Sequence, residues 1–173
     1  MKKCLIIVDF QNDFVDGALG FPDAKSIEPL ILDKIKDYLG NGHDLLFTFD
    51  THYEDYLETQ EGIRLPIKHC IYGTLGHELY GKVNDYRKHA KTVFNKVTFG
   101  SLELGNYLKD CDYDEIELAG LVTNMCVISN AIIAKSALPE ARIIVDSKAS
   151  LSFDMELHHK TLDVLKGLQV DVI

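Results

Sequence analysis

The sequence predicts a three-layer α/β/α sandwich with a six-stranded, mainly parallel sheet. Two observations support this fold class. Short apolar runs recur along the chain, and segments in which apolar residues recur at helical spacing separate most of them. The first run is also continuous rather than alternating, as in a strand that is buried on both faces. Strands that alternate with helices in this way are typical of a parallel sheet with right-handed crossovers.

Size and charge narrow the possible classes of protein. The chain has 173 residues, of which 46% are hydrophobic, so we expect one domain over residues 1–173. The net charge of −9 and the absence of a basic run make nucleic acid and membrane poor partners. No apolar stretch reaches the length of about 18 residues that spans a bilayer, which favours a cytoplasmic protein. The four cysteines form no Cys-x-x-Cys pair, which argues against a zinc finger or a disulfide framework.

The first four predicted strands each lead into a polar or reactive side chain. The expected strands cover residues 4–8, 44–49, 91–96, 116–119, 141–146 and 169–173. The side chains at or just past the ends of the first four are Asp9, Asp50, Lys96 and Cys126. Ligands of such sheets bind outside the carboxyl ends of the strands. We therefore expect these four side chains to meet at one edge of the sheet.

The helices are predicted from capping residues and apolar spacing. Ser26 is the expected N-cap of the first helix, which carries Pro29 in its first turn and ends at Gly40. Ser101 is the expected cap of a helix that reaches residue 109, and a long apolar helix is expected from residue 127. A short helix is expected at 74–81, and Ser152 or Asp154 caps the last helix.

Cys126 is the candidate nucleophile. The segment 114–130 has the pattern of a strand, a tight turn at Gly120 and a helix start, with Cys126 just inside the helix. The free N–H groups and the dipole of a helix N-terminus favour a negative charge, so we expect a thiol with a lowered pKa. The alternative interpretation is a small buried core cysteine.

A candidate metal site follows the second strand. Residues two apart on an extended chain point to the same side, so Asp50 and His52 can converge on one cation. His69 brings a second imidazole after the bend at Pro66. The alternative is a surface loop with incidental histidines. The other five histidines receive no role, and Asp13 is interpreted as a solvated loop acid.

Three motifs resemble the isochorismatase-like cysteine hydrolases, and within them the nicotinamidase/pyrazinamidase branch. They are Leu-Ile-Ile-Val-Asp-Phe-Gln-Asn-Asp-Phe-Val-Asp-Gly-Ala-Leu at 5–19, Phe-Asn-Lys at 94–96 and Ala-Gly-Leu-Val-Thr-Asn-Met-Cys-Val at 119–127. The resemblance covers nearly the whole chain and includes the Pro-x-x-His-Cys-x-x-Gly-Thr-x-Gly pattern at 66–76. It implies a Rossmann-like isochorismatase-like hydrolase fold and a catalytic triad of Asp9, Lys96 and Cys126.

The same resemblance implies the rest of the site. The bond from Leu121 to Val122 would be cis, and the backbone N–H groups of Val122 and Cys126 would form an oxyanion hole. The metal ligands would be Asp50, His52 and His69, with Glu61 at a suitable position for a further ligand and Glu58 as the alternative. Phe14 would line the substrate pocket, although an aromatic residue after a strand is more often part of a core.

The implied activity is hydrolysis of nicotinamide to nicotinic acid and ammonia through a cysteine thioester, with a role in NAD salvage. The implied cofactor is a divalent metal, with zinc expected and iron or manganese as alternatives. The implied partners are a small-molecule amide and further copies of the chain in a homo-oligomer. The chain departs from many nicotinamidases around His52, where it has Thr51 and Tyr53, and it contains no tryptophan.

Other functions fit the pattern less well. An isochorismatase-family hydrolase of another small amide, ureido or vinyl-ether substrate is the main alternative. A phospho-receiver module has no use for the cysteine. A dinucleotide-binding protein needs a Gly-rich turn after the first strand, and a haloacid-dehalogenase-like phosphatase needs an acid where this chain has Gln11. An inactive scaffold is the last alternative.

Overall fold

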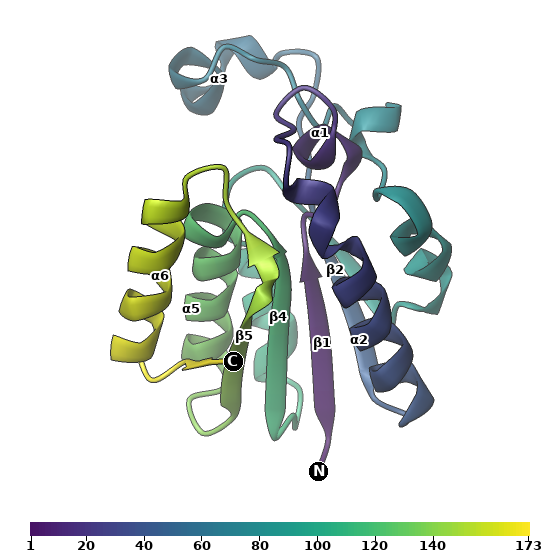
Figure 1. Ribbon diagram of the computed structural model, residues 1–173, viewed down its shortest axis with the longest axis vertical. Helices are drawn as coiled ribbons and strands as arrows, with labels where there is room; N and C mark the ends of the chain where they lie inside the picture. Colours follow the sequence, from purple (N-terminus) through teal and green to yellow (C-terminus); the bar gives the residue numbers. More distant parts are fainter.

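The computed structural model describes residues 1–173 and confirms the three-layer α/β/α architecture (Figure 1). The sheet has six strands in the order β3-β2-β1-β4-β5-β6, and all neighbouring strands are parallel. The strands are β1 (Lys3–Val8), β2 (Asp44–Asp50), β3 (Thr92–Lys96), β4 (Glu115–Leu121), β5 (Arg142–Leu151) and β6 (Asp171–Val172). The strand order reverses between β1 and β4, so their carboxyl ends mark the point where such sheets bind ligands.

Helices cover both faces of the sheet. The core on one face contains buried residues of α2 (Glu28–Gly40) and of the 3₁₀ segment Gly81–His89. The core on the other face contains buried residues of the remaining three long helices, and Figure 1 shows two of these, α5 and α6, side by side. These helices are α4 (Leu102–Lys109), α5 (Ile128–Ala137) and α6 (Met155–Gly167).

Alternation along β1 explains its continuous apolar sequence. Cys4, Ile6 and Val8 belong to the core beside α4, α5 and α6, whereas Leu5 and Ile7 belong to the core beside α2. Successive side chains of a strand point to opposite faces, so a strand covered on both faces needs apolar residues at every position.

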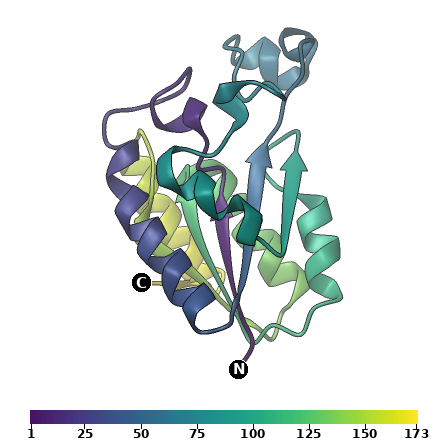
Figure 2. The same cartoon turned by 90° about the vertical axis from the view of Figure 1, so that its right-hand side faces the viewer.

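The long connection from β2 to β3 extends beyond the carboxyl ends of the strands. It contains α3 (Gln60–Arg64) and the 3₁₀ turns Tyr56–Glu58 and Leu75–His77, and the short helix α1 (Asn12–Val15) lies at the same end of the sheet. Figure 2 shows this connection above the arrowheads of β2 and β3. It therefore covers the edge at which the candidate residues were expected.

Several predicted boundaries are wrong. Ser26 is not an N-cap: it lies in the 3₁₀ turn Ala24–Ile27, its hydroxyl donates to the carbonyl of Asp23 at 2.7 Å, and α2 begins at Glu28. The expected helix at 74–81 is only the 3₁₀ turn Leu75–His77, and β6 is shorter than expected. The caps of α4 and α6 are confirmed: Ser101 Oγ accepts from Leu104 N–H, and Asp154 Oδ1 accepts from Leu157 N–H.

Strand β4 continues through Gly120 instead of ending before it. Gly120 has a φ of 132°, and a Cβ at this position would lie 2.0 Å from the carbonyl oxygen of Val8. Only glycine allows β4 to approach β1 this closely in that conformation. The turn of the chain accordingly begins after Leu121.

None of the helices combines the length and the apolar composition needed to cross a bilayer.

A buried charge cluster joins α2 to β4 and β5. Lys34 Nζ lies 2.6 Å from Glu117 Oε1 and contacts Asp146 Oδ2. The Tyr38 hydroxyl donates to Glu117 Oε2 at 2.6 Å. Both carboxylates are buried, so Lys34 is the cation that compensates their charge inside the fold.

Replacing Lys34 by methionine is expected to lower the free energy of unfolding by about 3 kcal/mol at neutral pH, because two buried carboxylates lose their cation. Burial opposes ionisation of Asp146, but hydrogen bonds from Lys34 and from the N–H groups of Ala149 and Lys148 outweigh it and lower its pKa. An acid with a lowered folded pKa stabilises the fold above its unfolded pKa of about 3.9, and this stabilisation is lost as the pH falls.

Urea unfolding at pH 7 and near pH 3 checks this prediction. The difference between wild type and Lys34→Met should shrink at the lower pH, because Asp146 in the variant becomes protonated and then no longer leaves a charge without its cation inside the fold. Lys36→Met is the matched control: this lysine is exposed and pairs only with Asp33, at 3.6 Å. Equal destabilisation by the two variants would contradict the prediction.

Candidate active site and metal centre

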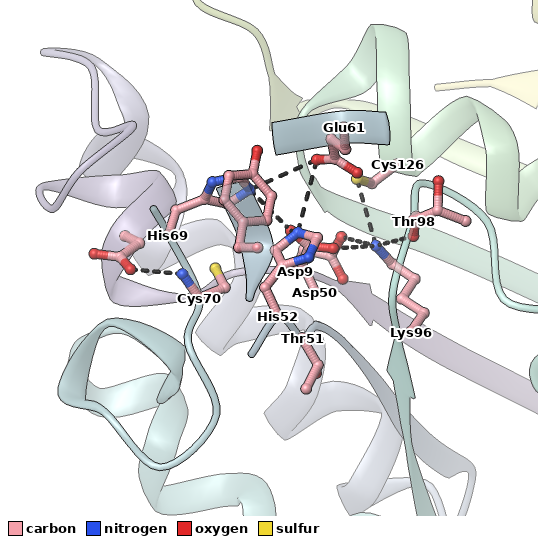
Figure 3. Close-up of polar contacts among 12 residues, drawn as sticks. Asp9, Asp50, Thr51, His52, Glu61, His69, Cys70, Lys96, Thr98 and Cys126 are labelled. Atoms are coloured by element: carbon pink, nitrogen blue, oxygen red, sulfur yellow. Dashed lines mark hydrogen bonds and ion pairs between the residues drawn. The ribbon is translucent and has the colours of Figure 1, made fainter. Parts of the chain in front are cut away.

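Asp9, Lys96 and Cys126 meet at the carboxyl ends of their strands, as the sequence predicted (Figure 3). Lys96 Nζ lies 2.6 Å from Asp9 Oδ2 and 3.5 Å from Cys126 Sγ. All three residues are buried, with Asp9 completely inaccessible. A carboxylate, an ammonium and a thiol are therefore held together away from bulk water.

Backbone register holds the Asp9 carboxylate in place. Val8 pairs with Thr48 on β2, and the N–H of Asp9 donates to the Thr48 carbonyl at 3.2 Å. The Thr48 hydroxyl donates to Asp9 Oδ1 at 2.7 Å, while Oδ2 faces Lys96. Asp9 has a φ of 46°, so the chain turns sharply as it leaves β1.

Lys96 connects the triad with the candidate metal ligands. Besides Asp9 and Cys126, its Nζ contacts Asp50 Oδ1 at 3.5 Å and donates to the Thr98 carbonyl at 3.0 Å. Burial alone would lower the pKa of Lys96, but the nearby carboxylates of Asp9 and Asp50 outweigh burial and raise it. The ammonium therefore stays protonated at neutral pH.

Burial raises the pKa of the Cys126 thiol well above its usual range, and the nearby Asp9 raises it further, although Lys96 acts in the opposite direction. The expected lowering of this pKa is therefore wrong, because the helix-terminus argument did not include the loss of solvent. Burial also raises the pKa of Asp9 against the influence of Lys96. The arrangement favours a neutral thiol beside a basic carboxylate.

The nucleophile turn differs from the simple helix start that was expected. The Leu121–Val122 bond is cis, as the resemblance implied. Cys126 then lies in a π-helical turn, Thr123–Val127, that precedes α5. The N–H groups of Met125 and Val127 both donate to the Val122 carbonyl, at 3.1 and 3.2 Å. π-Helical turns of this kind occur frequently at functional sites.

The metal-ligand candidates converge beside the triad. Ligand atoms of Asp50, His52, Glu61 and His69 all lie within 4.8 Å of one another. Asp50 Oδ2 is 3.1 Å from His52 Nε2 and 3.3 Å from His69 Nε2, and Glu61 Oε1 is 3.6 and 3.7 Å from the same two nitrogens. Glu61 on α3 rather than Glu58 completes the cluster. Two imidazoles and two carboxylates form a donor set that fits Zn, Fe or Mn.

Neighbouring side chains orient these ligands. Gln11, which is completely buried, binds the backbone of Asp50 twice: Nε2 donates to its carbonyl at 2.9 Å and Oε1 accepts from its N–H at 2.8 Å. The Nδ1 of His69 contacts the Ile67 carbonyl at 2.8 Å, which leaves Nε2 facing Asp50 and Glu61. Hydrogen bonds of this type fix the direction of metal ligands.

Some residues without an expected role prove to be structural. Asp13 is not a solvated acid: its Oδ2 accepts from the N–H of Cys70 at 2.7 Å, directly after His69. His77 is buried with its Nε2 2.9 Å from the Thr51 hydroxyl, and His158 contacts the Thr123 hydroxyl at 2.9 Å. Each of these contacts joins residues at least 26 positions apart in the chain, so no local pattern reveals them.

A cavity of about 460 Å³ lies between α3 and the loop after β3. It runs from the candidate ligand Glu61 to Met125, which precedes the candidate nucleophile. Its lining residues are Gln60, Glu61, Arg64, Leu65, Thr98, Phe99 and Met125. Phe14 is not among them: it packs against the core beside α2, and its ring centroid is 5.6 Å from that of His69.

The family model of the isochorismatase domain matches residues 3–173. The chain belongs to the isochorismatase family. This isochorismatase-family chain is 36% identical over 172 residues to the isochorismatase family protein PncA of Bacillus subtilis (strain 168), with 91% of each chain covered. Membership excludes the phospho-receiver, dinucleotide-binding and dehalogenase alternatives.

Other relatives of this isochorismatase-family chain carry a named activity. The nicotinamidase of Saccharomyces cerevisiae is 27% identical over 214 residues, with 99% of each chain covered. The crystal structure of the nicotinamidase/pyrazinamidase PncA from Bacillus subtilis matches the fold with a TM-score of 0.89 and 33% identity, again over 99% of each chain.

Proposed function

We propose that the protein is a metal-assisted cysteine amidohydrolase that converts nicotinamide and water to nicotinic acid and ammonia. The observation that carries this proposal is the buried contact of Lys96 with Asp9 and Cys126, directly beside the four-residue ligand cluster. The similarity to nicotinamidases over nearly the whole chain supports the choice of substrate.

Asp9 is the general base in this mechanism. It takes the proton of the Cys126 thiol, and Lys96 compensates the resulting negative charge. The thiolate attacks the carboxamide carbon, and the backbone N–H groups of Val122 and Cys126 stabilise the tetrahedral oxyanion. Asp9 then gives the proton to the amide nitrogen and the C–N bond breaks. Ammonia is released, and the acyl group remains bound to Cys126 as a thioester.

The second half of the reaction uses the same carboxylate. Asp9 takes a proton from a water molecule, and the hydroxide attacks the thioester carbon. The C–S bond then breaks, the proton passes from Asp9 to the sulfur, and nicotinic acid is released. The raised pKa of Asp9 makes it a stronger base than a free aspartate in both steps.

Asp50, His52, Glu61 and His69 would hold a divalent cation, for which we propose zinc, with iron or manganese as alternatives. When bound, such a cation supplies a Lewis-acid contact that orients a ring nitrogen of the substrate. Gln11 and Asp13 support this site by fixing the backbone of Asp50 and of Cys70, the residue after His69.

The wider role follows from the proposed reaction. We propose one domain, a cytoplasmic location, self-association into a homo-oligomer and a contribution to NAD salvage. The alternative is another small amide, ureido or vinyl-ether substrate. The departure from many nicotinamidases at Thr51 and Tyr53, beside the proposed ligand His52, is the reason to test it. A panel of these compounds distinguishes the two.

Chelation is expected to lower kcat/KM for nicotinamide by about 100-fold, because a misplaced ring loses the geometry needed for attack. Ammonia release before and after dialysis against a chelator measures the effect, and addition of Zn²⁺, Fe²⁺ or Mn²⁺ should restore it. Glu61→Gln should weaken metal retention, whereas Glu58→Gln, in the neighbouring 3₁₀ turn, should not. Unchanged activity after complete metal removal would refute the proposed role of the four ligands.

A further inference from the structure

Asn130 on α5 links the candidate nucleophile to the loop after β3. The residue is completely buried. Its Nδ2 donates to the carbonyl of Cys126 at 2.8 Å and to the carbonyl of Phe99 at 3.1 Å. Its Oδ1 accepts from the N–H of Ser101 at 3.0 Å. Both amide hydrogens and the carbonyl oxygen of the side chain thus have partners, all of them backbone groups.

The loop that Asn130 holds also carries parts of the site. Thr98, one residue before Phe99, accepts the hydrogen bond from Lys96 Nζ. Phe99 itself lines the cavity that reaches Met125. Asn130 is therefore bonded on one side to the nucleophile backbone, and on the other to a loop that contacts the triad lysine and forms a wall of the cavity.

The loop and α5 are joined both by apolar packing and by the hydrogen bonds of Asn130. The loop presses against α5 at Gly100, where a Cβ would lie 2.7 Å from Ile133 Cδ1. That contact is apolar and has no preferred direction, whereas hydrogen bonds weaken steeply when they are misaligned. The amide of Asn130 is the directional part of the interface between α5 and the loop.

We propose that Asn130 is a positioning residue that holds the Cys126 backbone and the loop Thr98–Ser101 in the mutual arrangement required for attack. It does not touch the reacting atoms. It acts through two separable links, one to Cys126 and one to the loop. The turnover part of this inference rests on the proposed function, but the reactivity of the Cys126 thiol can be measured without any assumed substrate.

A matched pair of variants separates the links. In a helix, a threonine hydroxyl can bond the carbonyl four residues earlier, which for position 130 is the carbonyl of Cys126. Asn130→Thr therefore keeps a link to Cys126 and loses both bonds to the loop. Valine has nearly the same shape as threonine but no hydroxyl, so Asn130→Val loses the links both to Cys126 and to the loop. Ser101→Ala removes only the side-chain cap of α4 and serves as the control for general destabilisation.

The experiment uses the metal-loaded full chain and three readouts: kcat and KM for ammonia release from nicotinamide, the rate of Cys126 carbamidomethylation by iodoacetamide, and the melting temperature. Peptide mass analysis separates Cys126 from the other three cysteines. A displacement of about 1 Å costs on the order of 100-fold in rate. We therefore expect Asn130→Val to lower kcat by about 10- to 100-fold and to lower the alkylation rate to a similar extent.

Compared with Asn130→Val, the variant Asn130→Thr should recover most of the alkylation rate, because its link to Cys126 is kept. Its KM should still be higher than that of the wild type, because its bonds to the loop are missing. Equal alkylation rates in the threonine and valine variants, or wild-type rates in the valine variant, would overturn the inference. The inference would also be overturned if Ser101→Ala had the same melting temperature as Asn130→Val and lost as much of its alkylation rate and kcat. If either variant does not fold, Asn130→Ser and Asn130→Ala provide the same comparison of one hydroxyl. If the wild type releases no ammonia, the proposed function fails while the alkylation rates still decide the role of Asn130.

Discussion

Replacement of Cys126 by alanine is expected to lower kcat for ammonia release from nicotinamide by at least about 10⁴-fold, because the thiol that forms the proposed thioester beside Asp9 and Lys96 is removed. Lys96 and Asp9 remain in this variant, so substrate binding and the melting temperature should change little. Steady-state ammonia release, with saturation curves for variant and wild type, measures the loss.

The chain offers a matched control for this substitution. Cys111 is a half-buried free cysteine whose thiol contacts the Tyr107 carbonyl on α4. It lies next to Asp112, which pairs with Lys2 before the start of β1, whereas the triad lies at the carboxyl ends of the strands. Cys111→Ala should retain wild-type kcat and KM. Substantial turnover by Cys126→Ala would refute the cysteine mechanism, and loss in both variants would point to general damage instead.

The convergence of three candidate side chains could be predicted from sequence because parallel topology brings strand ends together, whereas their roles as a triad were implied only by the family resemblance. Asp9, Lys96 and Cys126 lie at or after the ends of three different strands, and the carboxyl ends of parallel strands meet at one edge. The pair of Asp50 and His52 was predictable for a similar reason, since residues two apart on an extended chain share a side. These predictions needed only local patterns and one rule of fold geometry.

The supporting residues could not be predicted in this way. Gln11 and Asn130 are polar residues in ordinary sequence surroundings. Gln11 binds Asp50, 39 positions away, and Asn130 binds Phe99, 31 positions away. Their burial depends on the connection between β2 and β3 and on the loop after β3, whose paths no periodicity indicates. Asp13 was interpreted as a solvated acid because its partner, the N–H of Cys70, lies 57 residues further along the chain.

The pKa of Cys126 shows the same limit in energetic terms. A helix N-terminus stabilises an anion by about 0.3–1 kcal/mol at an exposed site, up to about 2 kcal/mol when partly buried, whereas transfer of an unpaired charge out of water costs several kcal/mol. The sequence indicates the first effect and not the second. Among the neighbours of Cys126, Lys96 is the group that lowers the pKa of the thiol, and the mechanism proposed above therefore relies on Lys96 to stabilise the thiolate that forms when Asp9 takes the proton.

Replacement of Lys96 by methionine is expected to have the largest combined effect on stability and activity. Lys96 lies 2.6 Å from the inaccessible carboxylate of Asp9, so its loss leaves a buried charge without a cation. Removal of one partner of a buried ion pair typically lowers the free energy of unfolding by about 3–5 kcal/mol. Activity should also fall by at least about 10³-fold, because the thiolate and the oxyanion lose their neighbouring positive charge.

A second substitution separates the two effects. In the double variant Asp9→Asn with Lys96→Met, the uncompensated carboxylate is absent, so urea unfolding should recover much of the stability that Lys96→Met loses. Activity should stay as low as in either single variant, because residues that act as a unit in catalysis are not additive. If the double variant were as unstable as the sum of the two single variants, the stability of the fold would not depend on charge compensation between Asp9 and Lys96. If Lys96→Met kept both stability and turnover, the buried contact between these residues would have neither the structural nor the chemical role proposed for it.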